Sequence, residues 1–145
     1  MRGLAIAALL ALGCGTSYQA KGLTGGYSER RLNERVFEVT FEGNGYTTRK
    51  AAHDGAIRRA ADIAMHLGYY GFWVAGQDTD VATSSYTQPV SCTSNAYSTN
   101  CTGGNTTNTH RPTSTVVVNM VTWQEAQQAP PGIIVYDARL ILAQR

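Results

Sequence analysis

The stretch between residues 49 and 67 most constrains what this chain can fold into, because its pattern fits an amphipathic helix. With about 100° between successive residues, the apolar side chains fall on one arc and the charged ones lie opposite. Thr47 or Thr48 can cap the start of this helix, and Gly68 can end it in a left-handed conformation. Gly55, on the polar side, should cost up to about 1 kcal/mol. The alanine-rich arc predicts close packing against a sheet; it comprises Ala52, Ala56, Ile57, Ala60, Ile63, Ala64 and Leu67.

Three segments have the composition of β-strands. Residues 36–42 alternate between apolar and polar side chains, 69–74 are rich in aromatics, and 115–123 contain a run of valines. The C-terminal segment, 133–145, predicts a short closing helix with Asp137 near its start, and an edge strand is the alternative. Together these elements predict an α+β fold.

The predicted fold is a small two-layer sandwich in which one amphipathic helix packs on a mostly antiparallel sheet of three to four strands. The first two strands would be parallel neighbours joined by a right-handed crossover. The second and third strands would pair antiparallel. Residues 83–115 between them are rich in Ser, Thr and Asn and have no apolar periodicity. A loop of this length is unusual in a small domain, which predicts a disordered or disulfide-pinned excursion or a functional flap.

The N-terminus has the organisation of a secretory signal. Arg2 supplies a positive charge, and the nine apolar residues 4–12 that follow are too few to span a bilayer. Residues 10–13 resemble the lipobox that precedes the acylated cysteine of bacterial lipoproteins, so Cys14 is the predicted lipidation site. The open alternative is ordinary signal cleavage, which would give a soluble secreted protein with a free thiol. Because Gly15 stands where Asp would favour inner-membrane retention, we expect a lipid-anchored protein of the outer membrane that faces the periplasm.

The chain therefore divides into a signal peptide at 1–13, a lipidated N-terminus and tether at 14–34, and a single α/β domain at 35–145. Its formal net charge is only +2, and charged residues make up 15% of the sequence. A nucleic-acid-binding protein would be expected to have a strongly basic face, so nucleic acid is not an expected partner.

Cysteine arithmetic predicts one disulfide bond. An odd number of cysteines is unusual in a secreted protein, and lipidation of Cys14 leaves Cys92 and Cys101 as a pair. Closing so short a loop should restrict the unfolded chain by about 2–3 kcal/mol. A metal or redox pair is the alternative, with His110 as the one further ligand within reach.

Several separated segments together resemble a family of small Gram-negative lipoproteins of unknown function. The resemblance extends over residues 25–74 and the order of elements that follow. It implies an envelope location and a small α/β fold, but no reaction and no site residues. The matching pieces are Gly25-Gly26-Tyr27-Ser28, Leu32, Phe37 to Tyr46 with Thr47-Thr48, Arg59-Ala60-Ala61-Asp62 and Gly68-Tyr69.

No catalytic pattern stands out in the sequence. There is no Gly-x-Ser-x-Gly elbow, no recognisable pair of acid/base carboxylates and no nucleotide-binding fingerprint. His53 and His66 lie too far apart around the helix to chelate one ion, so neither a metal nor a cofactor is expected. One possible anion site is the helix start, where free N–H groups would adjoin two cations. Its residues are Thr47, Thr48, Arg49 and Lys50.

These features predict a membrane-anchored envelope lipoprotein that is not an enzyme and acts as a binding or scaffolding module. Its predicted partners are the membrane, through the lipid on Cys14, and an envelope protein. The alternative is a secreted small-ligand-binding protein or a hydrolase with an unrecognised site. A hydrolase would need a nucleophile and a base that converge in a cleft.

Overall fold

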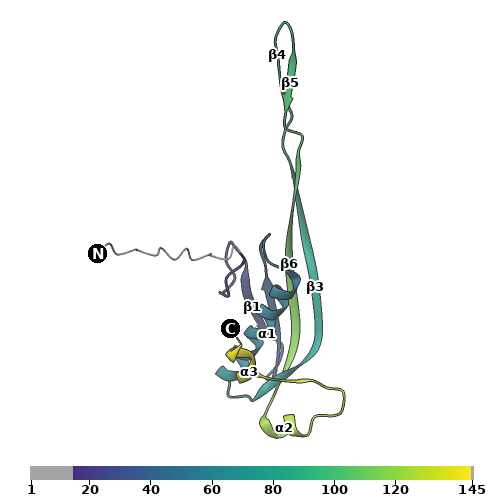
Figure 1. The fold of residues 1–145 in the computed structure, drawn as a ribbon. Coiled ribbons are helices and arrows are strands. Elements are labelled where there is room, and N and C mark those ends of the chain that lie inside the picture. Colours follow the sequence, from purple (N-terminus) through teal and green to yellow (C-terminus); the bar gives the residue numbers. More distant parts are fainter. Residues whose placement is uncertain (1–14, 145) are drawn as a thin grey trace, which may run out of the picture.

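The computed structural model describes residues 15–144, and β-strands make up most of its regular structure (Figure 1). The main sheet has five antiparallel strands in the order β1-β2-β6-β3-β7. Strands β4 and β5 form a separate two-stranded sheet. The strands are β1 (Gly26–Arg31), β2 (Val36–Glu42), β3 (Gly71–Thr87), β4 (Ser91–Ser94), β5 (Thr99–Thr102), β6 (Thr106–Val121) and β7 (Val135–Asp137). The helices are α1 (Arg49–His66), α2 (Trp123–Gln127) and α3 (Ala138–Ala143).

The predicted fold class, one helix on three to four strands, is wrong. The sheet has five strands, and two short helices accompany α1. The predicted parallel pairing of the first two strands is also wrong, because β6 lies between β2 and β3 and pairs antiparallel with both. The expected antiparallel pairing of the second and third strands is confirmed.

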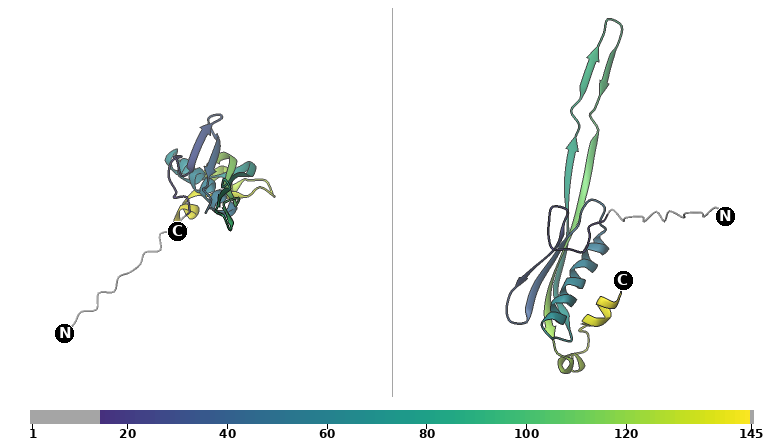
Figure 2. Two further views of the ribbon diagram at one scale, coloured as in Figure 1. Left: turned by 90° about the horizontal axis from the view of Figure 1, so that it is seen from above. Right: turned by 90° about the vertical axis from the view of Figure 1, so that its left-hand side faces the viewer.

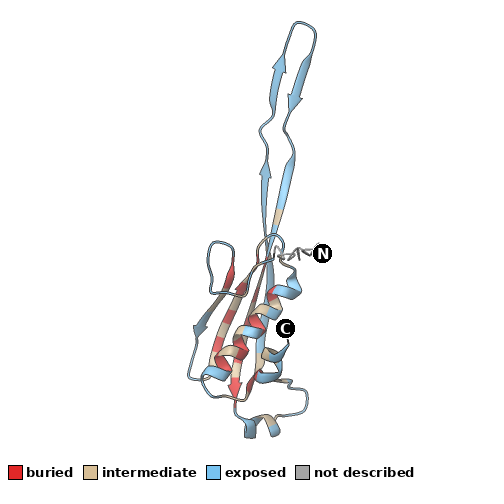
Figure 3. Ribbon diagram, turned by 60° about the vertical axis from the view of Figure 1, so that its left-hand side comes forward, coloured by how far each residue is buried: buried red, intermediate tan, exposed pale blue. Residues whose placement is uncertain are grey.

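Helix α1 packs on one face of the sheet, as its apolar arc predicted (Figure 3). Leu67 was wrongly included in that arc, because it follows the last residue of the helix and is 44% exposed. Thr48 caps the helix by accepting a hydrogen bond from the Ala51 N–H, and Gly68 follows its end with a φ of 79°. Gly55 does not lie free on the polar side: a Cβ added there would come within 2.6 Å of the Phe41 ring. The helix therefore approaches β2 so closely that only glycine fits at this position.

The C-terminal segment contains both of the predicted alternatives. Residues 135–137 form β7, which pairs with the first three residues of β3, and α3 follows directly. The Asp137 carboxylate accepts hydrogen bonds from the backbone N–H groups of Arg139 and Leu140, which confirms Asp137 at the helix start. Tyr136 stacks on the buried Phe72 ring and so attaches this segment to the core.

The predicted tether is not separate from the folded body over the residues that the structure describes. Residues 26–31 form the edge strand β1, paired with β2 along its length. Further upstream, the Thr16 N–H donates to Thr47 Oγ1 at 3.2 Å, and the Tyr18 hydroxyl donates to the Asp62 carboxylate. The pKa of Tyr18 is raised well above its usual range by burial and by this hydrogen bond. The N-terminal segment is thus part of the body from Thr16 onward.

Residues 83–115 are not a loop. Strands β3 and β6 continue as a pair from the body out to Thr87 and Thr106, and β4 and β5 follow beyond them. We call residues 82–111 the arm and the rest of the described chain the body. The arm projects far from the body as a narrow hairpin (Figure 2). Periodicity did not indicate strands here because apolar alternation arises only where one face of a strand is buried, and nearly all of the arm is exposed.

Candidate interaction surface

The surface chemistry of the arm differs from that of the body. From Thr83 to His110 the sequence contains no Asp, Glu, Lys or Arg. The exposed side chains are mostly hydroxyls and amides, among which stand two aromatic rings: Tyr86 is 64% exposed and Tyr97, near the tip, is 97% exposed. Tyrosine supplies a large contact area at low conformational-entropy cost, so this composition suits protein recognition.

Side-chain hydrogen bonds along one face of the arm keep the two strands in register. Directly opposed residues pair as Thr83–His110 at 3.1 Å, Ser85–Asn108 at 2.7 Å and Thr87–Thr106 at 2.9 Å. Such cross-strand pairs stabilise a sheet by about 0.2–1 kcal/mol each. The arm therefore holds its strand structure without a hydrophobic core.

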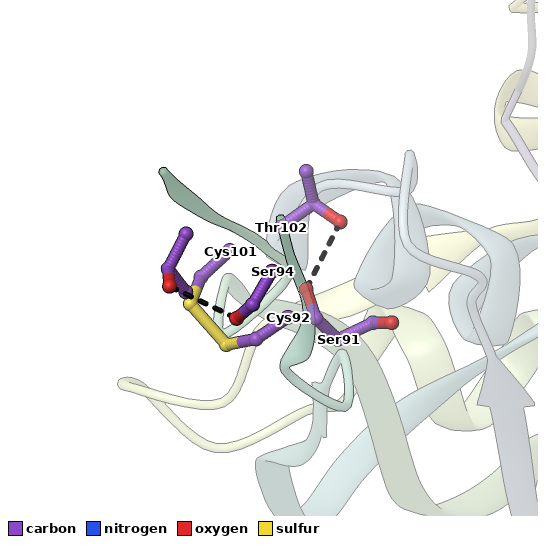
Figure 4. The surroundings of a disulfide bond; sticks show 6 residues. Ser91, Cys92, Ser94, Cys101 and Thr102 are labelled. Carbon is purple, nitrogen blue, oxygen red and sulfur yellow. Dashed lines mark hydrogen bonds between the residues drawn. A yellow bond between two sulfur atoms is a disulfide. The ribbon is translucent and has the colours of Figure 1, made fainter. Parts of the chain in front are cut away.

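The disulfide bond between Cys92 and Cys101 closes the distal end of the arm, as predicted (Figure 4). The two cysteines are directly opposed in the β4–β5 pair. Nearby, the Ser94 and Thr99 hydroxyls form a hydrogen bond of 2.9 Å. The alternative metal site loses its third ligand, because His110 pairs with Thr83 in the β3–β6 part of the arm, closer to the body than the cysteines. Among residues 15–144, no cluster of three potential metal ligands occurs.

Both edges of the arm are open for backbone pairing. Strand β7 covers β3 only at Gly71–Trp73, and β2 covers β6 only from Thr113 to Asn119. Beyond these positions, within the described chain, the outward N–H and C=O groups of β3 and β6 have no third strand beside them. Natural edge strands are commonly protected by charges, especially lysine. The absence of charge from 83–110 leaves these edges available to another strand.

The residues predicted as an anion site do not converge on a ligand position. Thr48 caps α1, and Thr47 Oγ1 is engaged by Thr16 and Asn44. Lys50 forms an ion pair with Asp54 one turn further along. Arg49 is exposed at the first position of the helix, and within residues 15–144 it forms no ion pair. The Thr47 and Thr48 hydroxyls therefore stabilise the fold and are not free to bind an anion.

One Ser–His contact was missed in the sequence, because its partners lie far apart in the chain. Ser114 Oγ lies 3.4 Å from His53 Nδ1 and 3.4 Å from the Thr79 hydroxyl. Ser114 is fully buried, on the face of β6 that packs against α1. A nucleophile must reach its substrate, so this pair fits a satisfied buried serine better than a hydrolytic site.

The open cleft at the end of the body away from the arm is also polar and aromatic. Its volume is about 650 Å³, and its lining includes Tyr69, Tyr70, Trp123 and Asp137. The Tyr70 and Trp123 rings meet edge to face at 4.8 Å. A hydrogen bond with Asp137 raises the pKa of Tyr70, which ties this tyrosine to the cap of α3.

An ion pair that spacing did not reveal fastens α2 to the body. Arg35 Nη1 lies 2.9 Å from Glu125 Oε1, and Glu125 also completes a capping box with Thr122. The hydrogen bond from Arg35, followed by those from Thr122, lowers the pKa of Glu125 to about 2. Their separation of 90 residues explains why sequence alone did not connect them.

The predicted signal peptide at 1–13 and the predicted lipidation site Cys14 lie outside the described residues. Within residues 15–144, no helix has the length and apolar character needed to cross a bilayer. Comparison of the chain with protein-family models, with curated proteins and with solved structures found no match.

Proposed function

We propose that this chain is a membrane-anchored envelope lipoprotein that binds a partner protein through the arm. The anchor is the lipid predicted on Cys14. The observation that carries the binding role is the arm itself: an exposed hairpin, free of charge from Thr83 to His110, with both backbone edges open.

Strand addition is the binding mode that these edges favour. In strand addition, an extended segment of the partner pairs with an exposed sheet edge, and main-chain hydrogen bonds supply much of the affinity. The Ser, Thr and Asn side chains would contribute further hydrogen bonds, and Tyr86 would contribute apolar contact. The partner is then an envelope protein with an extended or edge-exposed segment. Nucleic acid is disfavoured because the arm contains no cationic residue between Thr83 and His110.

Cross-linking in membranes tests this proposal. In one variant, residues 82–111 are replaced by Asn-Gly, a two-residue turn that rejoins β3 to β6. A second variant, Ser84→Lys/Tyr86→Lys, keeps the arm but adds edge charges. A matched control, Gln127→Lys/Gln128→Lys, adds the same charge near α2. We expect both arm variants to lose the cross-linked partner that the wild-type and control proteins retain.

Equal recovery of the partner by all four proteins would refute binding through the arm. Circular dichroism of each variant separates lost binding from lost folding. Since the arm adds no residue to the core cluster, the body of the arm-deleted variant should keep its helical signal.

A further inference from the structure

The point where the N-terminus joins the body limits how far a lipid on Cys14 can lie from the body. Thr16 is fixed on two sides: its N–H donates to Thr47 Oγ1, and its hydroxyl donates to the Thr24 carbonyl at 3.1 Å. Only Gly15 stands between Thr16 and Cys14. Two residue steps of extended chain span about 7 Å. An acyl chain on Cys14 would therefore enter the bilayer beside the part of the body that surrounds Thr16.

That part of the body presents an exposed aromatic ring and cations. Tyr46, next to Thr47, is 77% exposed. Arg49 and Lys50 begin α1, directly after the Thr48 cap. Arg58, two turns further along α1, lies with its guanidinium 4.6 Å from the centroid of the Tyr18 ring.

The carboxylates nearby are largely committed to other groups. Asp54 pairs with Lys50, Glu42 pairs with Lys21, and Asp62 accepts the Tyr18 hydroxyl. Arg49 and Arg58 form no ion pair within residues 15–144. Asp62 keeps its negative charge, because the Tyr18 hydroxyl that it accepts is neutral. The cations beside the attachment point therefore exceed the carboxylates by one positive charge, the groups being Lys21, Arg49, Lys50 and Arg58 against Glu42, Asp54 and Asp62.

We propose that Tyr46, Arg49, Lys50 and Arg58 form a membrane-contact patch that lies against anionic lipid headgroups. This proposal rests on the lipid anchor of the proposed function. Tyrosine favours the boundary between headgroups and acyl chains, and cations near an anionic surface each strengthen contact with it, by about fivefold. The patch needs no bound anion at the helix start, because the whole surface meets the bilayer.

The same contact restricts the direction of the arm. The arm leaves the body beside this patch, since the Gly43 N–H donates to the Pro112 carbonyl at 2.8 Å and Gly45 approaches Thr109. Open backbone edges cannot enter hydrocarbon, because their N–H and C=O groups would lose all partners. With the patch on the membrane, the arm extends along or away from the bilayer surface, where it meets partners close to the anchor.

Depth-dependent quenching of tryptophan fluorescence tests the patch. The acylated full-length protein is reconstituted into vesicles of phosphatidylethanolamine and phosphatidylglycerol that contain brominated acyl chains. Tyr46→Trp introduces a reporter in the patch. The 18 residues of α1 span about 27 Å, and the native Trp123 lines the cleft at the far end of this helix with Met65. The native Trp73 lines a pocket with Glu125 on α2. We expect strong quenching of the Tyr46→Trp protein and little quenching of the parent.

Charge variants sharpen the result. Arg49→Ala/Arg58→Ala, added to Tyr46→Trp, should reduce the quenching, whereas Arg139→Ala, on α3, should not. Replacing phosphatidylglycerol with a neutral lipid should reduce the quenching as well. If the introduced reporter and the native tryptophans are quenched equally, or if charge has no effect, the patch is refuted.

Intact-mass measurement distinguishes failure of the membrane-contact patch from failure of the lipid anchor. A mature protein without acyl chains refutes the anchor and, with it, the patch. An acylated Tyr46→Trp protein whose introduced reporter is not quenched refutes the patch alone and leaves the anchored function standing.

Discussion

The body and the arm share strands β3 and β6 but are held together by different forces. Within the body, β3 and β6 bury Phe72, Val116, Val118 and Met120 against α1. Within the arm the same strands have no buried apolar residue and depend on backbone pairing and on hydroxyl and amide side-chain pairs. One disulfide bond joins β4 to β5 beyond them. A buried hydrophobic face is therefore needed where β3 and β6 form the core of the fold. The same two strands can extend beyond the core without such a face, because their pairing is already in register.

Removal of a core side chain should give the largest effect on the body. Phe72 is fully buried and stacks on Tyr136, so Phe72→Ala should cost about 3–5 kcal/mol of unfolding free energy. Chemical denaturation followed by circular dichroism measures this loss. Tyr86→Ala, an equally large truncation on the arm, is the control and should change stability by less than about 0.5 kcal/mol. Similar losses in both variants would contradict the division between body and arm.

Loss of the disulfide should have an intermediate effect that is confined to the arm. Cys92→Ser/Cys101→Ser removes a constraint worth about 2–3 kcal/mol in the loop-entropy estimate. We expect faster amide hydrogen exchange in β4, β5 and the adjoining ends of β3 and β6, with unchanged protection in α1. If α1 loses protection to the same extent, the arm and the body unfold as one unit.

The smallest effect should come from acid, at the contact between α2 and the body. Because the folded-state pKa of Glu125 is lowered from 4.5 to about 2, its bond to Arg35 stabilises the fold fully above pH 4.5. This contribution is lost as pH falls through that interval. Trp123 begins α2, so its fluorescence should change between pH 4.5 and about 2.

Glu125→Gln supplies the matched comparison for the acid experiment. This variant cannot titrate at position 125, so its Trp123 fluorescence should change less with pH over the same interval. An identical acid response in both proteins would remove Glu125 as the cause.

The sequence predicted those elements whose signals are local. Helix α1, its Thr48 cap and the Asp137 helix start each depend on neighbouring residues, and all three are confirmed. The disulfide followed from the cysteine count and is also confirmed. These signals do not require knowledge of what lies across the sheet.

The features that the sequence did not predict depend on contacts between separate helices and strands. Strand β1 is polar and charged, and its place in the sheet is supported by Arg30 pairing with Glu38 on β2. In the sequence, Gly55 was expected only to lower helix stability on an exposed face. In the structure, its lack of a side chain allows α1 to contact Phe41. The candidate interaction surface was recognised as unusual in composition, yet its strand structure comes from pairing between β3 and β6, which composition does not encode.

The disulfide also gives the maturation of this protein an order in time. The core of the body contains no cysteine, so its folding does not depend on redox conditions. The Cys92–Cys101 bond forms only where the surroundings are oxidising. A newly made chain in a reducing compartment would have a competent body and an unlocked arm. For the exported lipoprotein that we propose, covalent closure of the tip would follow export, and a reduced tip would mark a molecule that is not yet mature.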